Sequence, residues 1–381
     1  MANTQKITRP VLMMALVVGV ITPASASAEN GFTINPRGRI FFDIAAIDYN
    51  LTNLTTNITT SEARTARLGV QGTFGKNFSY VAEFDGVGGD IQAQDLIITA
   101  KFGDGWAVVV GNQKPANSIE EQTSGRYLTF MERAAITDAT RLSRNLGVNL
   151  TKKGDNYHLA AGVFTSNINT ALIDGNSLIT DEFVIAGRAS FAPINEKNHK
   201  LHLGIHARYF DGAPSLNLSF RARPNVHLSQ RLLSVRNQGD SSTLVGVEAA
   251  WVKNAFHLHG EWMQEDANDR VQGGFVQAGW FITGEHRNYG AGSSKFGRTK
   301  PNKALSDGGY GAFEIAARYD WTTVDGRSNS QIDNWTLGFN WYLEDKVRIV
   351  TNLVHSSASG IGASFGGGSA TIGQVRFQLD W

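Results

Sequence analysis

Apolar and polar residues alternate strictly along much of the chain. From Val375 to Trp381 every second residue is apolar, and the residues between them are polar or charged. The same period of two recurs over Leu201–Tyr209, Phe313–Trp321 and Trp335–Trp341. This period is typical of a β-strand with one apolar and one polar face. The pattern predicts an all-β protein.

Short groups of turn-forming residues, such as Gly103-Asp104-Gly105 and Glu344-Asp345-Lys346, separate pairs of these segments. Such turns join antiparallel strands in hairpins. Longer stretches, including the polar Asn50–Ser61 and the glycine-rich Gly360–Gly368, fall between the hairpins and are expected to be loops. Short turns at one end and long loops at the other are typical of a transmembrane antiparallel β-barrel. We expect sixteen strands, enough to leave an aqueous channel, at 37–49, 62–74, 78–85, 94–102, 106–113, 144–152, 156–165, 182–192, 200–210, 242–252, 256–265, 273–284, 311–321, 331–342, 346–355 and 370–381.

A soluble β-sandwich would alternate in the same way and is the alternative fold. Aromatic residues near the predicted strand ends favour the membrane barrel, in which aromatic girdles mark the two interfaces. No stretch after residue 28 approaches roughly eighteen consecutive apolar residues, so a membrane-spanning helix is not expected. The proposed girdle residues are Trp106, Tyr157, Tyr209, Trp251, Trp262, Trp321, Trp341 and Trp381.

Residues 1–28 have the features of a secretory signal peptide. Lys6 and Arg9 precede an apolar run, Val11–Ile21, that is too short to span a bilayer as a helix. Small residues follow it, and we expect cleavage after Ala28, with one barrel domain over residues 29–381. The alternative is an uncleaved anchor.

Composition narrows the possible chemistry. The chain contains no cysteine, which excludes disulfides, thiol chemistry and cysteine-ligated metals. The formal net charge of +1 becomes −1 without Lys6 and Arg9. Any ion preference must therefore depend on where charges lie rather than on their sum.

Two long segments interrupt the regular spacing of strands. Lys114–Ser143 follows the fifth predicted strand and is rich in charged residues, serine and threonine. Asp211–Ser241 follows the ninth and carries four arginines and a histidine: Arg221, Arg223, His227, Arg231 and Arg236. We expect the functional chemistry to lie in these segments.

Several motifs resemble the phosphate-selective porin O and P family. They include GNQKP at Gly111–Pro115 and EEQTSGRYLTFMERA at Glu120–Ala134. Phe281–Glu285, Phe296–Arg298 with Lys300-Pro301, and Glu314–Tyr319 are similar to the family's long turn after strand twelve and the strand behind it. The resemblance covers residues 30–381.

The resemblance implies a porin of the bacterial outer membrane that transports ions and has no enzymatic activity. It implies a homotrimer surrounded by outer-membrane lipid and lipopolysaccharide and inserted by the β-barrel assembly machinery. The expected cargo is inorganic anions such as phosphate, or small polar solutes, and no cofactor or nucleic acid is expected. The third external loop, Lys114–Ser143 here, folds into the lumen of family members and forms the constriction.

In the family, arginines of the later loop and of early strands line the channel as a ladder for anions. Guanidinium suits phosphate because it stays charged and offers a planar fork of donors, and several weak sites in series allow conduction. Arg64 lies on the lipid side by strict alternation and can contribute only if it sits in the loop or beside a bulge. Lys295, Arg298, Lys300 and Lys303 make the turn 284–310 basic, and in the family that turn bends into the barrel. The candidate anion-path residues are Arg39, Arg67, Lys114, Ser124, Arg126, Arg221, Arg223, Arg231 and Arg236.

One position departs from the family pattern. Phosphate-selective members carry a lysine just before the Thr-Ser pair of the constriction loop, and Glu121 stands there in this chain, beside Glu120. Carboxylates at a constriction oppose dianions and favour cations. The alternative function is therefore a general porin, or a porin for other solutes, without phosphate selectivity.

Other interpretations follow from the same residues. Loop arginines are often simply solvated, or bind lipopolysaccharide phosphates outside the channel. His202, His206, His257 and His259 are spaced to suggest a metal site, but histidines on a wet lumen wall are ordinary, and we expect no metal. No G-x-S-x-G motif supports a barrel hydrolase, and a structural or adhesive barrel remains a further alternative.

Overall fold

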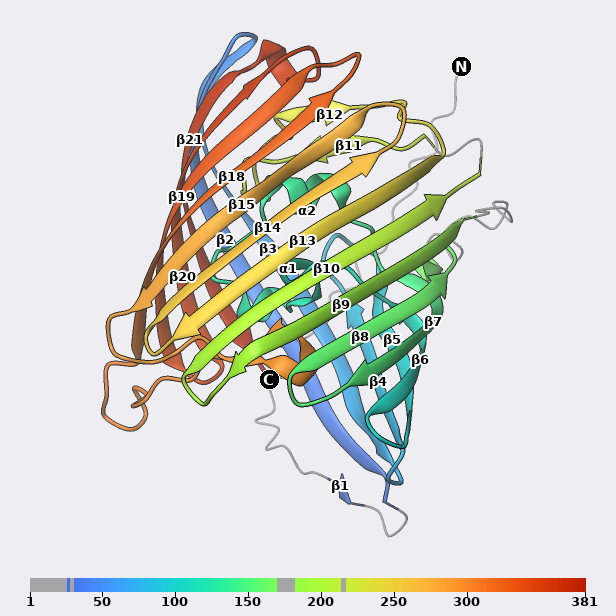
Figure 1. Cartoon of the computed structure of the whole chain (residues 1–381). Helices are drawn as coiled ribbons and strands as arrows, with labels where there is room; N and C mark the ends of the chain where they lie inside the picture. Colours follow the sequence, from blue (N-terminus) through green and yellow to red (C-terminus); the bar gives the residue numbers. More distant parts are fainter. Residues whose placement is uncertain (1–25, 28–30, 170–181, 214–216) are drawn as a thin grey trace, which may run out of the picture.

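Sixteen strands form a closed antiparallel barrel in the computed structural model, which describes residues 26–27, 31–169, 182–213 and 217–381 (Figure 1). Each barrel strand pairs with the next along the chain, and the first, β2, pairs with the last, β21. The prediction of a sixteen-strand transmembrane barrel is confirmed, and the sandwich alternative is wrong. The barrel strands are β2 (Thr33–Leu51), β3 (Leu54–Phe74), β4 (Phe78–Asp85), β5 (Gln92–Phe102), β6 (Trp106–Gln113), β7 (Asn145–Lys153), β8 (Tyr157–Phe164), β9 (Phe183–Asn195), β10 (His199–Asp211), β13 (Ser241–Lys253), β14 (Phe256–Asp266), β15 (Arg270–Phe281), β18 (Ala312–Asp325), β19 (Ser330–Glu344), β20 (Val347–Ser359) and β21 (Gly368–Asp380).

Alternation decides which side chains face the lumen. Along β2, Phe42 and Ile44 point outward and are exposed, whereas Arg39, Phe41 and Asp43 point inward and are buried. An apolar outer face and a polar inner face satisfy lipid and water at once.

The barrel closes at the C-terminal tryptophan. The Trp381 amide donates to the Gly38 carbonyl at 3.1 Å, and the Gly38 amide donates to the Trp381 carbonyl at 3.0 Å. A β-carbon on Gly38 would lie 2.3 Å from the indole ring. Glycine at position 38 therefore makes room for the aromatic ring at the seam.

Two sequence-based boundaries are corrected. The predicted loop Asn50–Ser61 is mostly strand, because β2 runs to Leu51 and β3 starts at Leu54. Its threonines and isoleucine favour extended backbone, which outweighs their polarity. The strand predicted to end at 284 ends at Phe281. Except for Ala26 and Ser27 (β1), the predicted signal peptide lies outside the described residues, so its cleavage stays a prediction.

At the loop end of the barrel the apolar residues move to the inside. On β2, Ile47, Tyr49 and Leu51 are inward and buried, whereas Asp48 and Asn50 are outward and exposed. The second irregular segment fills the lumen here, and its Val226 and Leu233 belong to the same apolar cluster. Its short hairpin, β11 (Phe220–Ala222) with β12 (Leu233–Val235), lies across this end (Figure 1). The polar outer positions indicate that this rim projects beyond the membrane hydrocarbon.

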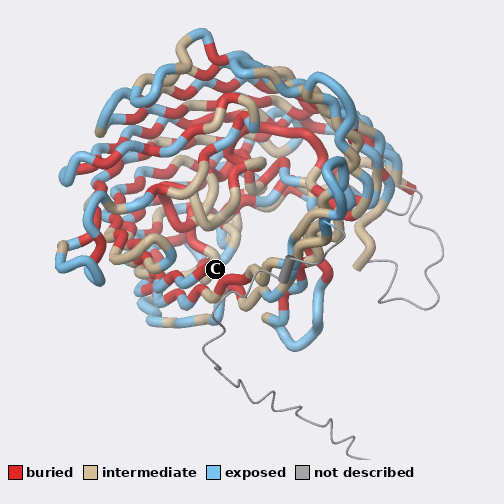
Figure 2. The backbone as a smooth tube through the Cα atoms, turned by 90° about the horizontal axis from the view of Figure 1, so that it is seen from below, coloured by how far each residue is buried: buried red, intermediate tan, exposed pale blue. Residues whose placement is uncertain are grey.

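Other chain segments also lie inside the barrel. The first irregular segment contributes α1 (Ile119–Gln122), a short 3₁₀ turn at Gly125–Tyr127 and α2 (Ala135–Thr140). The long turn after β15 contributes β16 (Tyr289–Gly290) and β17 (Lys295–Phe296). Figure 2 shows this inner chain gathered toward one side of the barrel. Among the described residues, none of the helices has the length and apolar character needed to cross a membrane.

Candidate functional site

The first irregular segment, Lys114–Ser143, lies along one side of the lumen, where side chains of the barrel wall form hydrogen bonds with its backbone. Carboxylates and an amide from four strands accept its N–H groups, and arginines donate to its carbonyls. The loop amide donors and their side-chain acceptors are Ile119 and Glu248, Glu120 and Glu261, Met131 and Asn352, and Ala135 and Asp320, at 2.6, 2.7, 2.9 and 3.0 Å. Arg348 donates to Leu128 and Thr129, and Arg376 to Met131, at 2.7, 2.9 and 2.6 Å.

This attachment divides the lumen into two walls. We call β10 to β21, which hold the loop, the packed wall, and β2 to β9, which face open space, the open wall. A cavity of about 980 Å³ lies between the loop and the open wall. The prediction that Lys114–Ser143 folds into the lumen agrees with this geometry.

The cavity is strongly cationic. Among the described residues, fourteen arginines and lysines line it, against five carboxylates. Four further carboxylates behind the surface, Asp43, Glu83, Glu248 and Asp380, pair with lining arginines. Cations still outnumber carboxylates by fourteen to nine. Within the described part of the chain, the side-chain nitrogens of Arg141, Arg223 and Lys295 form no ion pair with a carboxylate within 4.0 Å.

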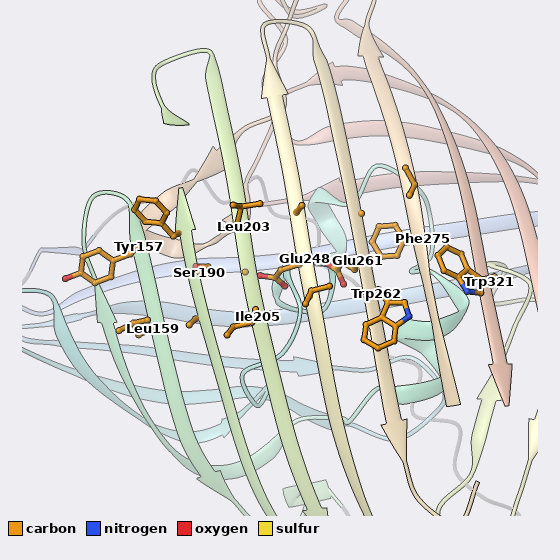
Figure 3. Close-up of a pocket in the computed structure, with 17 residues that line it drawn as sticks. Tyr157, Leu159, Ser190, Leu203, Ile205, Glu248, Glu261, Trp262, Phe275 and Trp321 are labelled. Carbon is orange, nitrogen blue, oxygen red and sulfur yellow. The ribbon is translucent and has the colours of Figure 1, made fainter. Parts of the chain in front are cut away.

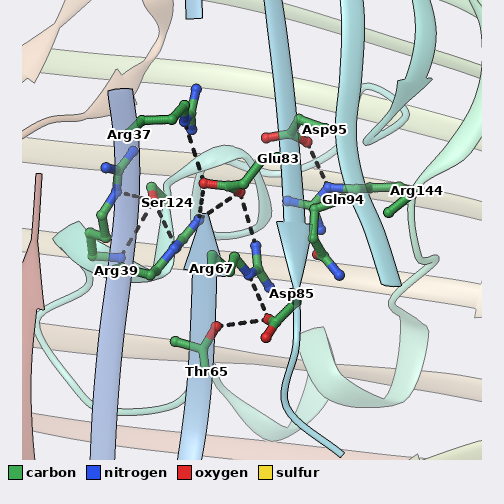
Figure 4. Close-up of polar contacts among 12 residues, drawn as sticks. Arg37, Arg39, Thr65, Arg67, Glu83, Asp85, Gln94, Asp95, Ser124 and Arg144 are labelled. Carbon is green, nitrogen blue, oxygen red and sulfur yellow. Dashed lines mark hydrogen bonds and ion pairs between the residues drawn. The ribbon is translucent and has the colours of Figure 1, made fainter. Parts of the chain in front are cut away.

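Three arginines of the open wall share one buried carboxylate (Figure 4). Arg37, Arg39 and Arg67 approach Glu83 at 3.3, 3.1 and 3.4 Å. Arg67 also donates through Nε to Asp85 at 2.8 Å. We call these five residues the wall cluster.

The loop brings further donors to the wall cluster. Arg39 donates through Nη1 to Ser124 Oγ at 3.4 Å, and the Arg126 side chain donates to the same oxygen at 3.4 Å. Arg144, immediately before β7, pairs with Asp95 at 2.6 Å beside the cluster (Figure 4). Guanidinium groups of the wall and the loop thus meet across the cavity.

Seven of the nine predicted anion-path residues line this one cavity. They are Arg39, Arg67, Lys114, Ser124, Arg126, Arg223 and Arg231. Arg221 and Arg236 do not line it and are exposed on the second irregular segment. Arg221 lies on β11 between Phe220 and Ala222, which belong to the buried apolar cluster of the rim.

The two glutamates of the constriction loop occupy different surroundings. Glu120 does not reach the cavity: it accepts from Thr137 Oγ1 at 2.6 Å and from the Ala134 amide, and lies beside Arg318 of the packed wall. Burial raises the pKa of Glu120 despite Arg318. The expected pair of carboxylates at the open surface is therefore reduced to Glu121.

Glu121 lines the cavity but is held between two cations, Lys114 at 2.9 Å and Arg133 at 3.2 Å. Burial opposes its ionisation, but Arg133 and Lys114 outweigh burial and lower the pKa of Glu121 to about 2. Burial and the charge of Arg133 lower the pKa of Lys114 to about 7. The carboxylate is thus ionised and neutralised locally.

Arg64 reaches the lumen through a bulge. Phe41 pairs with Thr65 and Phe42 with Ala63, so Arg64 is an extra residue in β3. Its guanidinium pairs with Glu132 of the loop at 2.9 Å. Strict alternation would place Arg64 on the lipid side, and this bulge is what lets its side chain enter the lumen.

Sequence reasoning missed several residues that line the cavity or lie directly behind its surface. The inward position predicted by alternation would have identified the lining residues Arg188 on β9, Arg376 on β21 and Asp85 on β4, and Glu83 behind them on β4. No such signal marks loop residues. The missed cations are Arg37, Arg133, Arg141, Arg144, Arg188 and Arg376.

The basic turn after β15 bends into the barrel, as the resemblance implied. The Phe296 amide donates to Thr123 Oγ1 of the constriction loop at 3.3 Å. Arg298 pairs with Asp380 and Lys295 lines the cavity, whereas Lys300 pairs with Asp345 at 2.8 Å and is largely exposed. The turn thus contacts the constriction loop from the end of the barrel opposite to the rim that the second irregular segment fills.

The four histidines serve the packed wall. His202 contacts Glu248 and the Tyr289 hydroxyl at 2.9 and 2.6 Å, and His206 lies 3.7 Å from Glu248. His257 contacts Glu314 and His259 contacts Glu261, at 2.7 and 2.9 Å. Within the described ranges, no group of three or more His, Asp or Glu side chains is placed to hold a metal ion.

A second hollow, of about 990 Å³, lies on the outer face of the barrel (Figure 3). Leu203, Ile205 and Trp262 line it, over strands β10 and β14. Small residues, including Ala249 and Gly260, create the depression. The lining is apolar and faces lipid, so this groove is separate from the cationic cavity.

Comparisons with known proteins agree with this architecture. The family model described as phosphate-selective porin O and P matches residues 34–381. An uncharacterized protein of Caulobacter vibrioides is 29% identical over 348 residues, which cover 87% of this chain and 69% of that protein. Porin O of Pseudomonas aeruginosa is 24% identical over 388 residues, covering 88% and 85%.

The fold is similar to that of an anion-selective porin from Comamonas acidovorans. The TM-score is 0.57 at 12% identity, over 92% of this chain and all of that one. The match to the family model extends from the first barrel strand to the last residue. The chain belongs to the phosphate-selective porin O and P family, and it is a channel protein of the bacterial outer membrane rather than an enzyme.

Proposed function

We propose that this porin conducts anions such as phosphate through the cavity between the constriction loop and the open wall. The observation that carries the proposal is the excess of cations there, fourteen to nine once the carboxylates behind the surface are included. Walls of low dielectric constant concentrate the field of such a lining and raise the local concentration of counter-ions. An anion therefore meets an attractive potential along the path.

Arginine suits this role better than a compact cation. Each guanidinium stays charged at any physiological pH and presents five donors in a plane, which match phosphate oxygens in pairs. Arg223 and Arg231 come from the second irregular segment, Arg39 and Arg67 from the open wall, and Arg126 from the constriction loop. Several partial sites in series let an anion advance without being trapped, which conduction requires.

The constriction loop does not oppose this path strongly. Glu121 is balanced by Lys114 and Arg133, so its field is largely cancelled at the cavity surface. Ser124 adds a neutral donor beside Arg39 and Arg126. The alternative, a general porin without phosphate selectivity, rests on Glu121 and on the carboxylates that already occupy many guanidinium donors.

Two measurements in planar lipid bilayers test the proposal. The zero-current potential in a KCl gradient should show preference for chloride, and millimolar phosphate should inhibit the chloride current. Chloride preference without inhibition would favour the general anion porin. Preference for potassium would overturn the anion pathway.

The remaining expectations rest on the signal-like N-terminal residues and on the family resemblance. We propose export with cleavage after Ala28, insertion by the β-barrel assembly machinery, and a homotrimer in contact with lipopolysaccharide. N-terminal sequencing of the protein from outer membranes should begin at Glu29, and its mass in mild detergent should correspond to three chains. A longer N-terminus or a monomer would contradict these two expectations.

A further inference from the structure

Glu83 lies behind the cationic surface rather than on it. It points inward from β4, its side chain is 0% exposed, and it does not line the cavity. The three arginines that it contacts all line the cavity. An anion in the channel therefore meets guanidinium groups and not the carboxylate.

Each arginine has a second contact that fixes its orientation. Arg39 reaches Ser124 Oγ at 3.4 Å and Arg67 reaches Asp85 at 2.8 Å. Arg37 donates through Nη1 to Gln71 Oε1 at 3.0 Å. A guanidinium has five N–H donors, so these contacts leave donors on each group for a further acceptor.

Three guanidinium groups this close together repel one another in a medium of reduced dielectric constant. One shared carboxylate offsets that repulsion and still leaves two positive charges among the four groups. Rigid placement of donors before binding reduces the entropy lost on binding. Glu83 can therefore strengthen anion binding although its own charge is negative.

We propose that Glu83 is a positioning residue for the anion path, which holds Arg37, Arg39 and Arg67 as one preformed site for an oxyanion such as phosphate. This inference rests on the proposed anion function and adds a specific role to a carboxylate. Its distinctive consequence is that phosphate binding and anion preference respond differently to the loss of the carboxylate: phosphate binding weakens, whereas anion preference is retained.

The test compares variants by the phosphate concentration that halves the chloride current. Glu83→Gln removes the charge, and Glu83→Asp keeps the charge but withdraws the carboxylate by one methylene. We expect the half-inhibiting concentration to rise about tenfold in Glu83→Gln, because roughly one charge-assisted contact is lost per bound anion. We expect a smaller rise in Glu83→Asp, with chloride preference retained in both.

Asp138→Asn is the matched control, because it also removes one carboxylate charge at the same cavity. Asp138 pairs with Arg231 at 3.2 Å and does not contact the wall cluster. A purely electrostatic role for Glu83 predicts that Glu83→Gln and Asp138→Asn both lower the half-inhibiting concentration, and that Glu83→Asp leaves it unchanged. That result would overturn the positioning role.

The outcome for the wild type separates this inference from the proposed function. If phosphate does not inhibit the wild-type current, the phosphate pathway itself is wrong. If phosphate inhibits the wild type and the Glu83 variants equally, only the positioning role is wrong. Single-channel current verifies that each variant is folded, and Glu83→Asp decides the question if Glu83→Gln does not form channels.

Discussion

The two walls of the lumen carry similar side chains but use them differently. On the packed wall, arginines such as Arg348 and carboxylates such as Glu248 and Asp320 bind the backbone of the constriction loop. On the open wall, Arg39 and Arg67 bind carboxylates beside the cavity and keep other donors facing it. An inward charge is therefore structural where a loop covers it and available to solutes where none does.

The largest expected effect comes from removing guanidinium groups from the open wall. Arg39→Gln combined with Arg67→Gln should raise the half-inhibiting phosphate concentration by about a hundredfold or more, because charge-assisted hydrogen bonds contribute about 1.5–3 kcal/mol each and the variant loses two of them. Bilayer measurements of phosphate inhibition check this. Arg221→Gln combined with Arg236→Gln is the control, since it removes the same charge outside the cavity, and an equal effect of both pairs would break the distinction between lining and exposed arginines.

A substitution on the packed wall should change the size of the channel. Arg348→Met removes the donors to Leu128 and Thr129, which leaves loop carbonyls with fewer partners and weakens the attachment by about 1–3 kcal/mol. We expect higher and noisier single-channel conductance with weaker chloride preference. Arg270→Met, an exposed arginine on β15, should leave conductance unchanged. Wild-type conductance in Arg348→Met would show that the loop needs no such attachment.

The two walls meet at the seam between β2 and β21, which should be sensitive to size at one glycine. Gly38→Ala places a methyl group against the Trp381 ring and should lower the free energy of unfolding in urea by about 1–3 kcal/mol. Gly373→Ala on β21 is the control, because in the described part of the chain no atom lies within 4 Å of a β-carbon there. Equal stability of both variants would contradict the packing of Trp381 on Gly38.

A smaller effect should appear when pH changes the charge beside Glu121. Lys114, with a pKa of about 7, is mainly cationic at pH 6 and mainly neutral at pH 8, whereas Glu121, with a pKa of about 2, stays ionised throughout. Chloride preference should therefore fall as the pH rises through 7. Zero-current potentials across this range measure the change, and Lys114→Arg should flatten it. The same pH dependence in Lys114→Arg would assign it to another group.

Much of the fold was predictable because alternation is a local property. The inward position of Arg67 follows from its neighbours Leu68 and Val70, and the strand count follows from repeated apolar faces. The limits of β3 were not predictable from polarity, since threonine-rich sequence reads as a loop although it favours extended backbone. The inward apolar residues at the rim, such as Ile47 and Leu51, become interpretable only once the second irregular segment is seen to fill that end.

The candidate site was predictable only in part. Family motifs indicated the constriction loop and two of its four cations, Lys114 and Arg126. The partners of each charge depend on contacts between residues far apart in sequence. Glu121 is neutralised by Lys114 and Arg133, and Glu120 is turned toward the packed wall. Arg64 enters the lumen through a bulge that no local pattern marks. Long-range packing of the loop decides these orientations.

The most direct measurement of the central claim is the zero-current potential of the wild-type channel in a KCl gradient, repeated with the Arg39→Gln and Arg67→Gln double variant. If anions pass along the open wall, the wild type should prefer chloride and the variant should lose most of that preference. Potassium preference in the wild type, or the same chloride preference in both proteins, would contradict it.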